Sequence, residues 1–257
     1  MDIDPTEPTR VPARVSVIGD GRLGSALAGA LRAAGIEVLG PVGRSERPAA
    51  ADAIVLCVPD AEIPAAAELA AGRAPLVGHT SGATPLSALE AAGGEAFGLH
   101  PLQTFAGGEP PEHFRGTGCA VAGTTPAALA FATMLAGALG MHAFEINDEA
   151  RPAYHAAASV ASNFLVTLLA TAEETAAAAG IEADEARALL TPLVRSTVEN
   201  WAALGPERAL TGPLARGDEA TVDAQRRALE SSAAHLLPLF DELAERTRIL
   251  AGRRVLA

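Results

Sequence analysis

The chain has 257 residues, of which 49% are hydrophobic and 19% charged, a composition that favours packed globular domains over disorder. Its formal net charge of −12 argues against a nucleic-acid partner and against binding to an anionic membrane surface. Every basic residue is arginine, so a lysine cannot be the general acid of any reaction that this protein catalyses.

The first half of the chain alternates predicted strands with predicted helices. Residues 1–12 are acidic and proline-rich, and we expect them to be disordered. Strands are predicted over 13–19, 36–40, 53–58, 76–77, 96–99, 119–122 and 143–146, and helices over 23–34, 63–71 and 125–139. The strands are apolar throughout, which is typical of a parallel sheet covered on both faces. We therefore expect a doubly wound, mostly parallel α/β sheet of the Rossmann type over 13–148.

The second half has only helical patterns. Helices are predicted over 150–179, 184–204, 219–229 and 236–250. These define an all-α domain over 149–257, which we expect to contribute to substrate binding and dimerisation. Helices this long rarely bury both faces within so small a domain, so they are expected to pair across a two-fold axis in a homodimer.

Targeting and redox signals favour a cytoplasmic protein. The N-terminal residues contain no apolar signal-peptide core, and no stretch is expected to span a membrane, because charged residues, glycine and proline interrupt the alanine-rich segments. Cys57 and Cys119 lie in strand-like runs and are interpreted as small buried hydrophobic residues in a reducing compartment. The spacing of histidines and cysteines predicts no metal site.

A glycine-rich turn links the first predicted strand to its helix. Gly19, Gly21 and Gly24 form a GxGxxG pattern that also includes Arg22 and Leu23. In this context the glycines allow a tight turn, close approach of a pyrophosphate to the backbone, and close helix–strand packing. The free N–H groups of the helix N-terminus would bind the anion. A glycine-rich turn without a ligand is the alternative.

The second strand ends at Arg44 and Ser45, about 20 residues beyond the last motif glycine. NAD-type sites place an acidic residue here to accept from the ribose 2′-hydroxyl, whereas a guanidinium and a hydroxyl suit a 2′-phosphate. Arg47 could add to this pocket, and Glu46 is the only acid nearby. The pattern favours NADP(H), with a solvated loop arginine as the alternative.

Further cofactor contacts are expected where later strands end. Val58, Pro59 and Asp60 follow the third strand, and Ser81 follows the fourth in the sequence HTSG. In a doubly wound sheet this edge faces the ribose and nicotinamide. Asp60 could equally cap the helix that follows it.

Three polar residues with helical spacing are the candidates for the chemistry. His155, Ser159 and Asn163 are spaced i, i+4, i+8 among apolar neighbours. Hydride transfer needs a proton donor and a group that orients the substrate, and we assign these tasks to His155 and Asn163. The alternative is a hydrogen-bonded polar seam at an interface.

Two loops offer further contacts to the substrate. His100 and Gln103 lie in HPLQTF, just after the fifth strand, where open α/β sheets bind ligands. A structural, hydrogen-bonded histidine is the alternative for His100. Arg216, in LTGPLARGD, could bind a carboxylate, or it could belong to a surface ion pair beside a helix that Asp218 caps.

The layout resembles the 6-phosphogluconate dehydrogenase-like superfamily, which includes ketopantoate reductase, pyrroline-carboxylate reductase and prephenate dehydrogenase. HTSG, HPLQTF, YHAAASVASN and LTGPLARGD more closely resemble a bacterial family in which a Rossmann-like domain precedes a helical domain of unknown function. Ketopantoate reductases have a lysine acid followed by two asparagines on the first helix after the cofactor domain. The resemblance places this set on His155, Ser159 and Asn163, where only Asn163 matches in type.

These observations predict NADPH-dependent reduction of a small carboxylated ketone or imine, with ketopantoate as the first substrate to test. HPLQTF also resembles a His-Pro stretch of prephenate dehydrogenases, which leaves open an oxidative reaction on a prephenate-like acid. A non-catalytic NADP-binding sensor or scaffold is the alternative outside enzymes.

Overall fold

A computed structural model describes residues 14–256, with side chains described up to Gly252. The predicted disordered segment 1–12 lies outside the described residues. The chain divides into two compact units, Met1–Ser162 and Asn163–Ala257, and each is described by itself below.

The first unit contains a seven-stranded sheet with the order β2-β1-β3-β4-β5-β6-β7. Its strands are β1 (Arg14–Ile18), β2 (Glu37–Val42), β3 (Ala53–Leu56), β4 (Leu76–His79), β5 (Glu95–Pro101), β6 (Gly118–Gly123) and β7 (His142–Glu145). The strands β1 to β5 are parallel, β6 is antiparallel to β5, and β7 is parallel to β6. The predicted doubly wound, mostly parallel sheet is therefore confirmed.

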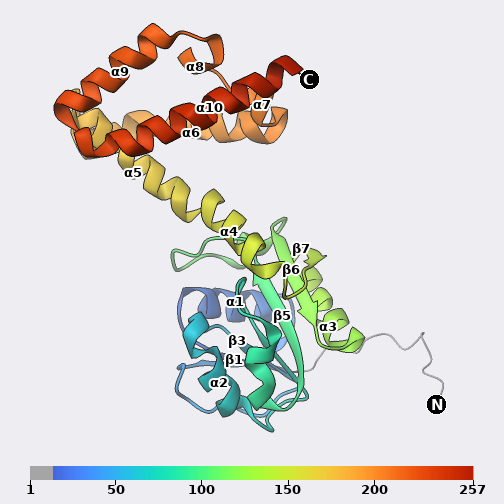
Figure 1. The fold of residues 1–257 in the computed structure, drawn as a ribbon. Coiled ribbons are helices and arrows are strands. Elements are labelled where there is room, and N and C mark those ends of the chain that lie inside the picture. The colour runs from blue at the N-terminus through green and yellow to red at the C-terminus, as the bar shows by residue number, and fades with distance from the viewer. Residues whose placement is uncertain (1–13, 257) are drawn as a thin grey trace. The chain divides into compact units, whose positions relative to one another are not determined.

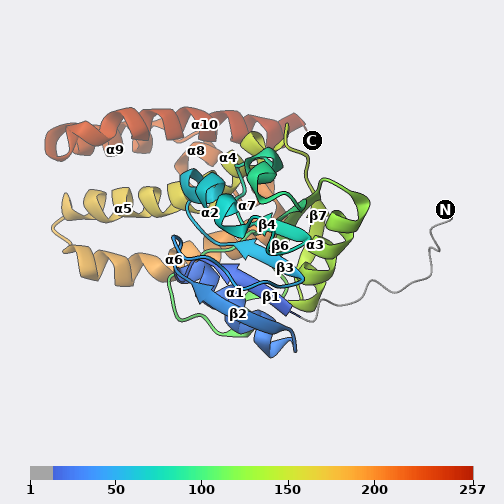
Figure 2. The same cartoon turned by 90° about the horizontal axis from the view of Figure 1, so that it is seen from below.

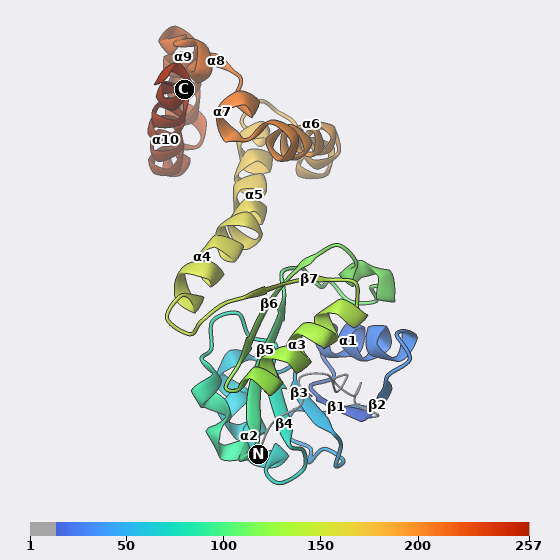
Figure 3. The same ribbon diagram turned by 90° about the vertical axis from the view of Figure 1, so that its right-hand side faces the viewer.

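Helices cover both faces of this sheet. Helices α1 (Arg22–Ala33) and α3 (Pro126–Ala138) lie on one face, and α2 (Ile63–Ala70) lies on the other (Figure 3). The first two helices contribute to one apolar cluster, and α2 and η2 (Leu86–Ala92) contribute to the other. Two short 3₁₀ helices, η1 (Asp60–Glu62) and η3 (Pro111–Phe114), complete the connections. This two-face burial explains why the central strands are apolar throughout.

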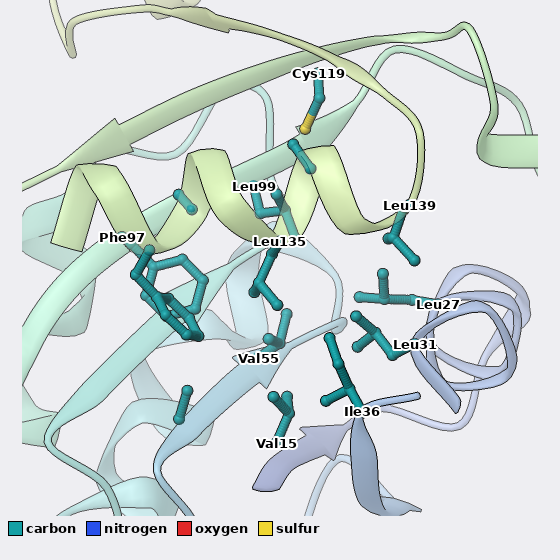
Figure 4. Packing of buried hydrophobic residues seen from close by; sticks show 14 of the residues in the cluster. Val15, Leu27, Leu31, Ile36, Val55, Phe97, Leu99, Cys119, Leu135 and Leu139 are labelled. Atoms are coloured by element: carbon teal, nitrogen blue, oxygen red, sulfur yellow. The ribbon is translucent and has the colours of Figure 1, made fainter. Parts of the chain in front are cut away.

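The larger core lies between the sheet and the α1/α3 layer (Figure 4). Leu27 and Leu31 of α1 are fully buried, as is Leu135 of α3. Phe97 of β5 meets Phe131 of α3 edge to face, with ring centroids 5.0 Å apart, a geometry that aromatic rings prefer. This packing fixes β5 under α3 and so positions the end of β5, where the candidate site lies.

Helix α4 (Arg151–Ala161) closes the first unit and lies beside β7 (Figure 1). The sequence-based boundary at residue 148 therefore lies one helix before the division that the structure shows. The physical reason is Arg151, which is 1% exposed and holds the start of α4 among residues of the sheet domain. Ser162 interrupts the predicted run 150–179, so α4 and α5 are separate helices.

The second unit is entirely helical in the part that the structure describes. It contains α5 (Asn163–Ala177), α6 (Ala183–Leu204), α7 (Pro206–Ala209), α8 (Pro213–Arg216), α9 (Glu219–Ser232), η4 (Ala234–Leu236) and α10 (Leu237–Leu256). Helices α5 and α6 lie side by side (Figure 2), joined by a bidentate ion pair of Arg187 with Glu173, both contacts at 2.8 Å. An ion pair of Arg226 with Asp241 joins α9 to α10.

Large apolar side chains remain exposed on the second unit. Phe164 of α5 is 61% exposed, and Leu193 and Trp201 of α6 are 63% and 58% exposed. The stretch Arg151–Ala177 also reaches a mean hydropathy of 1.3, so by length and composition alone it could cross a membrane. The expectation that no stretch would pass this test is corrected: the alanines, leucines and valines of this stretch raise its mean hydropathy more than its few charged residues lower it.

Candidate active site

The glycine-rich turn between β1 and α1 is shaped by close backbone contacts. Gly19 has φ +102°, and a Cβ there would lie 2.2 Å from the carbonyl oxygen of Cys57, the first residue after β3. A Cβ on Gly24 would lie 1.9 Å from the carbonyl oxygen of Gly19. Gly21 is different, because a Cβ there would meet nothing within 4 Å. Two of the motif glycines are therefore required by packing, and the third leaves open space beside the backbone.

That open space belongs to a cavity of about 530 Å³ at the carboxyl ends of β1, β2 and β3. It is lined by Gly19, Asp20, Gly21, Gly43, Arg44, Ser45, Glu46, Cys57, Val58 and Pro59. Six residues predicted to bind the cofactor are thus brought together here. Arg22, Leu23 and Gly24 follow in the first turns of α1, whose N-cap makes no side-chain hydrogen bond. The N–H groups of this helix end are available to an anion.

The part of this cavity that follows β2 contains side chains suited to a phosphate, and it also contains the acidic Glu46. Arg44 and Ser45 lie on it, as the sequence predicts for a 2′-phosphate. Glu46 also lines it, and its Oε1 accepts a hydrogen bond from the Gly43 N–H at 3.2 Å. The residues fit a phosphorylated dinucleotide if the Glu46 carboxylate moves away on binding, so that the Gly43 N–H can donate to the ligand instead.

Asp60 does not cap a helix. It is the first residue of η1, whose N-cap is Pro59, and the N-cap of α2 is Glu62; neither cap makes a side-chain hydrogen bond. The capping interpretation is therefore wrong. Asp60 instead raises the pKa of both His79 and His100 through its charge, against larger opposing effects, which places it near the ends of β4 and β5.

A hydrogen bond at the end of β5 joins two chemically active side chains. Nδ1 of His100 lies 2.6 Å from the hydroxyl of Tyr154 on α4, and the two rings are perpendicular with centroids 5.5 Å apart. The other side of the Tyr154 ring contacts Phe144 of β7, with centroids 5.8 Å apart. Both partners of the hydrogen bond are only partly buried.

His155 lies next to this pair. Its ring centroid is 6.2 Å from that of His100. Gly82, in the loop after β4, fits between the two rings: a Cβ there would lie 2.9 Å from both Nε2 of His100 and Cδ2 of His155. The structure thus brings together two residues that the sequence predicted separately, His100 and His155.

Burial sets the protonation of this group of residues. It lowers the pKa of His100 to about 4, with the charges of His155 and Arg151 adding to the effect. Burial also lowers the pKa of His79 to about 4, again helped by Arg151, and it raises the pKa of Tyr154 to about 12. At neutral pH both imidazoles are therefore neutral and the phenol is protonated.

Arg151 fixes the orientation of α4. Its Nε donates to Asp148 Oδ1 at 2.6 Å and its Nη1 donates to the carbonyl oxygen of Ser81 at 3.3 Å. Its Nη2 has no hydrogen-bond partner among the described residues and lies where a Cβ on Gly98 would be 2.7 Å away. Arg151 and Tyr154 are spaced i, i+3, so the buried arginine sets which helix face meets His100.

Other predicted site residues have local structural roles. Ser81 Oγ accepts from the N–H groups of Ala83 and Thr84 and closes the turn after β4. Gln103 Oε1 accepts from the N–H of Thr104 at 2.8 Å. Both residues thus have local hydrogen bonds, and their predicted contacts to a ligand stay predictions.

The predicted stripe is divided between the two units. Ser159 lies on α4, one turn after His155, but Asn163 begins α5 beyond the interruption at Ser162. The i, i+8 spacing therefore no longer implies a shared face, since it assumes one continuous helix. Arg216 ends α8 in the second unit, and Asp218 caps α9 by accepting from Thr221 N–H at 3.2 Å, as predicted.

The cysteines behave as the sequence predicts. Both are free thiols, Cys119 fully buried and Cys57 partly so. Burial raises the pKa of each thiol to about 12, so neither is a thiolate nucleophile at neutral pH. Among the described residues no cluster of histidine, cysteine and acidic side chains is suited to a metal ion.

Residues 117–247 match the model of a domain of unknown function, DUF2520. The chain belongs to the DUF2520 family. The match covers the last strands of the sheet, α4 and most of the helical unit, so α4 with its Tyr154 and His155 lies inside the family's domain. No curated protein matches the chain.

Solved structures share this fold over nearly the whole DUF2520 chain. A Bacteroides fragilis protein described as an NADP oxidoreductase, BF3122, is 21% identical, with a TM-score of 0.77 over 92% of this chain and 98% of its own. Protein TM1727 from Thermotoga maritima is 23% identical, with a TM-score of 0.75 over 93% and 98%. A Plasmodium falciparum pyrroline carboxylate reductase with NADP bound is 13% identical, with a TM-score of 0.58 over 93% and 98%.

Proposed function

We propose that this DUF2520 protein is an NADPH-dependent reductase of a small carboxylated ketone or imine. The observation that carries the proposal is the position of two features along one sheet edge. The cavity beside Gly21 and Arg44 lies at the ends of β1 to β3, and the His100–Tyr154 pair lies at the end of β5. Ligands of open α/β sheets bind along this edge.

The choice of NADP(H) rests on Arg44 and Ser45 in the lining of the cavity. The pyrophosphate would bind the N–H groups at the start of α1, where the absent side chain of Gly21 permits close approach. Arg44 and Ser45 would bind the 2′-phosphate. The similar folds described as an NADP oxidoreductase and as a reductase with NADP bound support this choice.

When bound, NADPH supplies a hydride to an electrophilic carbon. The protein must then add a proton to the substrate oxygen or nitrogen and hold the substrate's carboxylate. The face of α4 that carries Tyr154 and His155 offers the proton donors near the cofactor edge. The roles of Arg216 and Asn163 as contacts to the substrate stay predictions from the sequence. The product carries a CH–OH or CH–NH group.

The test compares cofactor binding with turnover. Calorimetry should show NADPH binding in preference to NADH, and Arg44→Gln should weaken NADPH binding about 10-fold, or ~1.4 kcal/mol, while leaving NADH binding unchanged. Arg115→Gln, an exposed arginine outside the cavity, is the control. Ketopantoate and 1-pyrroline carboxylates are then the first substrates to supply with NADPH.

Two rival functions predict different results. A dehydrogenase acting on a prephenate-like acid would form product with NADP+ and would not oxidise NADPH with any keto acid. A sensor or scaffold would bind NADPH tightly and turn over nothing. Failure to bind either nucleotide would reject all three functions.

We also propose that the protein is a homodimer in the cytoplasm. The exposed apolar side chains of Phe164, Leu193 and Trp201 on α5 and α6 support association through the helical unit. A cavity of about 590 Å³ between α5, α6, α9 and α10 is lined almost entirely by apolar side chains, which adds to this unpaired surface. The free thiols of Cys57 and Cys119 are compatible with a reducing compartment.

A further inference from the structure

We propose that Tyr154 is the proton donor of the reaction and that His100 is the residue that positions and reprotonates it. This inference rests on the proposed reductase function and replaces His155, the donor that the sequence indicated. It assigns a catalytic role to the first residue of YHAAASVASN, a position to which the sequence analysis gave no role.

The hydroxyl of Tyr154 has a fixed position, and the side chain that carries it is only partly buried. The perpendicular contact with His100 and the contact with Phe144 fix its ring from two sides. Its oxygen lies 2.6 Å from His100 Nδ1, and the side chain is only partly buried. A hydroxyl in this setting has one partner in the protein and can make a second hydrogen bond to a ligand.

The position on the sheet places this hydroxyl at the cofactor edge. His100 lies near the end of β5, and β5 is separated from β3 by β4 alone. Neighbouring strands are about 4.8 Å apart, so the end of β5 is roughly 10 Å from the end of β3. Cys57 and Val58, directly after β3, line the cofactor cavity. A small substrate between the cavity and α4 can therefore reach both.

His155 is less suited to this task. Its contact with the described site is an edge-on ring contact with His100, whereas Tyr154 shares a short hydrogen bond with the same ring. A donor must be protonated before the reaction and must regain its proton afterwards. Tyr154 meets the second requirement directly, because its partner His100 can donate through Nδ1.

The protonation states agree with this assignment. Burial raises the pKa of Tyr154 to about 12, so the phenol keeps its proton throughout the neutral range. Burial and the nearby charges of His155 and Arg151 lower the pKa of His100 to about 4, so its ring is neutral, with one nitrogen that donates and one that accepts. Arg151 also favours the phenolate form of Tyr154 once the proton has left.

The proton balance of the step is complete. As the carbonyl carbon gains a hydride, the O–H bond of Tyr154 breaks and its proton joins the substrate oxygen, giving the alcohol and a phenolate. His100, in its Nδ1–H tautomer, then returns a proton to the phenolate while its Nε2 takes one from water, and the hydroxide left behind is neutralised in the solvent. The ring ends in the other neutral tautomer, and exchange with solvent restores the first. Water is the only co-reactant besides NADPH.

The experiment exploits the fact that Tyr154 is the only tyrosine of the chain. Protein made with 3,5-difluorotyrosine is altered at this position alone, and fluorine makes the phenol more acidic. The pH at which Tyr154 ionises is read from its ¹⁹F resonance, with or without turnover. In the same samples kcat/KM for ketopantoate reduction is measured against pH, alongside Tyr154→Phe, His100→Gln and the control His142→Gln, an exposed histidine.

The proposal predicts three results. Tyr154→Phe should bind NADPH as the wild type does and lose about 100-fold or more in kcat/KM. The fluorinated enzyme should lose activity at the pH where its own ¹⁹F resonance titrates, since a phenolate has no proton to give. His100→Gln should shift the ¹⁹F resonance and slow turnover, whereas His142→Gln should do neither.

Other results would overturn it. Tyr154 is not the proton donor if Tyr154→Phe keeps kcat/KM within about threefold of the wild type. The same follows if the activity of the fluorinated enzyme does not change at the pH where its ¹⁹F resonance titrates. Either result leaves the reductase function intact. Equal losses in NADPH affinity and turnover would make Tyr154 a structural residue. If the wild type binds NADPH and reduces no ketone, the reductase function itself fails, and this assignment fails with it. Should Tyr154→Phe not fold, the fluorinated enzyme, which keeps the hydroxyl, decides alone.

Discussion

At the scale of single residues, the site contains several groups whose pKa differs from that of the free side chain. His79 is the clearest example, because it is fully buried at the end of β4 and its Nδ1 accepts from the Ser81 N–H at 3.2 Å. Its burial holds the ring neutral. Neutral buried imidazoles make a folded protein sensitive to acid, since only the unfolded chain binds the proton readily.

We expect the free energy of unfolding to fall as the pH is lowered from about 6.5 to about 4. The pKa of His79 is lowered to about 4 in the folded protein, so its contribution is present above the unfolded pKa of about 6.5 and is lost on acidification. His79→Gln removes the titration and should make the fall shallower. Urea unfolding at pH 7 and pH 5 measures this; an unchanged slope beside the control His142→Gln would contradict it.

His155→Ala separates the two candidate donors. If Tyr154 donates the proton, this change should reduce kcat less than about tenfold, since it removes a ring contact and not the donor. NADPH affinity should not change. Stopped-flow measurement of NADPH oxidation is the test, and a loss matching that of Tyr154→Phe would return the donor role to His155.

The sequence predicted the geometry of the glycine-rich turn, and distance along the chain explains why it did not indicate Tyr154. The glycine-rich turn is local, so its geometry follows from consecutive residues. Tyr154 and His100 are 54 residues apart, and their hydrogen bond exists only because α4 returns to the end of β5. The predicted stripe also passed over Tyr154, because it followed an i, i+4 spacing that begins one residue later.

At the scale of elements, Arg151 connects α4 to the sheet. The sequence shows this arginine as the first residue of an alanine-rich helix, where an exposed position is the usual expectation. In the structure it is buried and bonded to Asp148 and to the Ser81 carbonyl. Strand and helix bounds were predictable to within a few residues, but the anchoring of α4 required knowing what lies beneath its first turn.

Arg151→Met should destabilise the first unit and loosen α4. The change removes a buried guanidinium and leaves Asp148, which is 40% exposed, so we expect a loss of about 2 kcal/mol, below the range for a fully buried pair. Arg187→Met breaks the exposed pair with Glu173 and should destabilise the protein much less, because exposed ion pairs contribute little. Urea unfolding compares the two variants, and equal effects would contradict the anchoring role.

At the scale of the whole molecule, the two units differ in how they bury apolar residues. The sheet domain encloses two clusters of fully buried side chains, whereas the helical unit has few buried residues and several large exposed ones. The stretch whose hydropathy would suit a membrane span, Arg151–Ala177, includes α5, whose large apolar side chains are exposed. The sequence predicted the helical unit and its unpaired faces, because both depend on periodicity alone.

A charged residue on these faces should dissociate the proposed dimer. Leu193 is 63% exposed on α6, and Leu193→Glu would place a carboxylate in the proposed interface. Sedimentation velocity should show a wild-type dimer and a monomeric variant. Glu199→Gln, a substitution on the same helix that removes a charge instead, is the control. A monomeric wild type would reject the dimer.

Gly82 has a practical consequence for anyone who alters this protein. The spacing between two imidazole rings depends on a position whose side chain is a single hydrogen atom, and even a methyl group there would sit 2.9 Å from both. Libraries meant to widen the range of accepted substrates should therefore keep position 82 constant and vary the surrounding walls. A change at this one residue would disturb both rings at once, and its effects could not be traced to either.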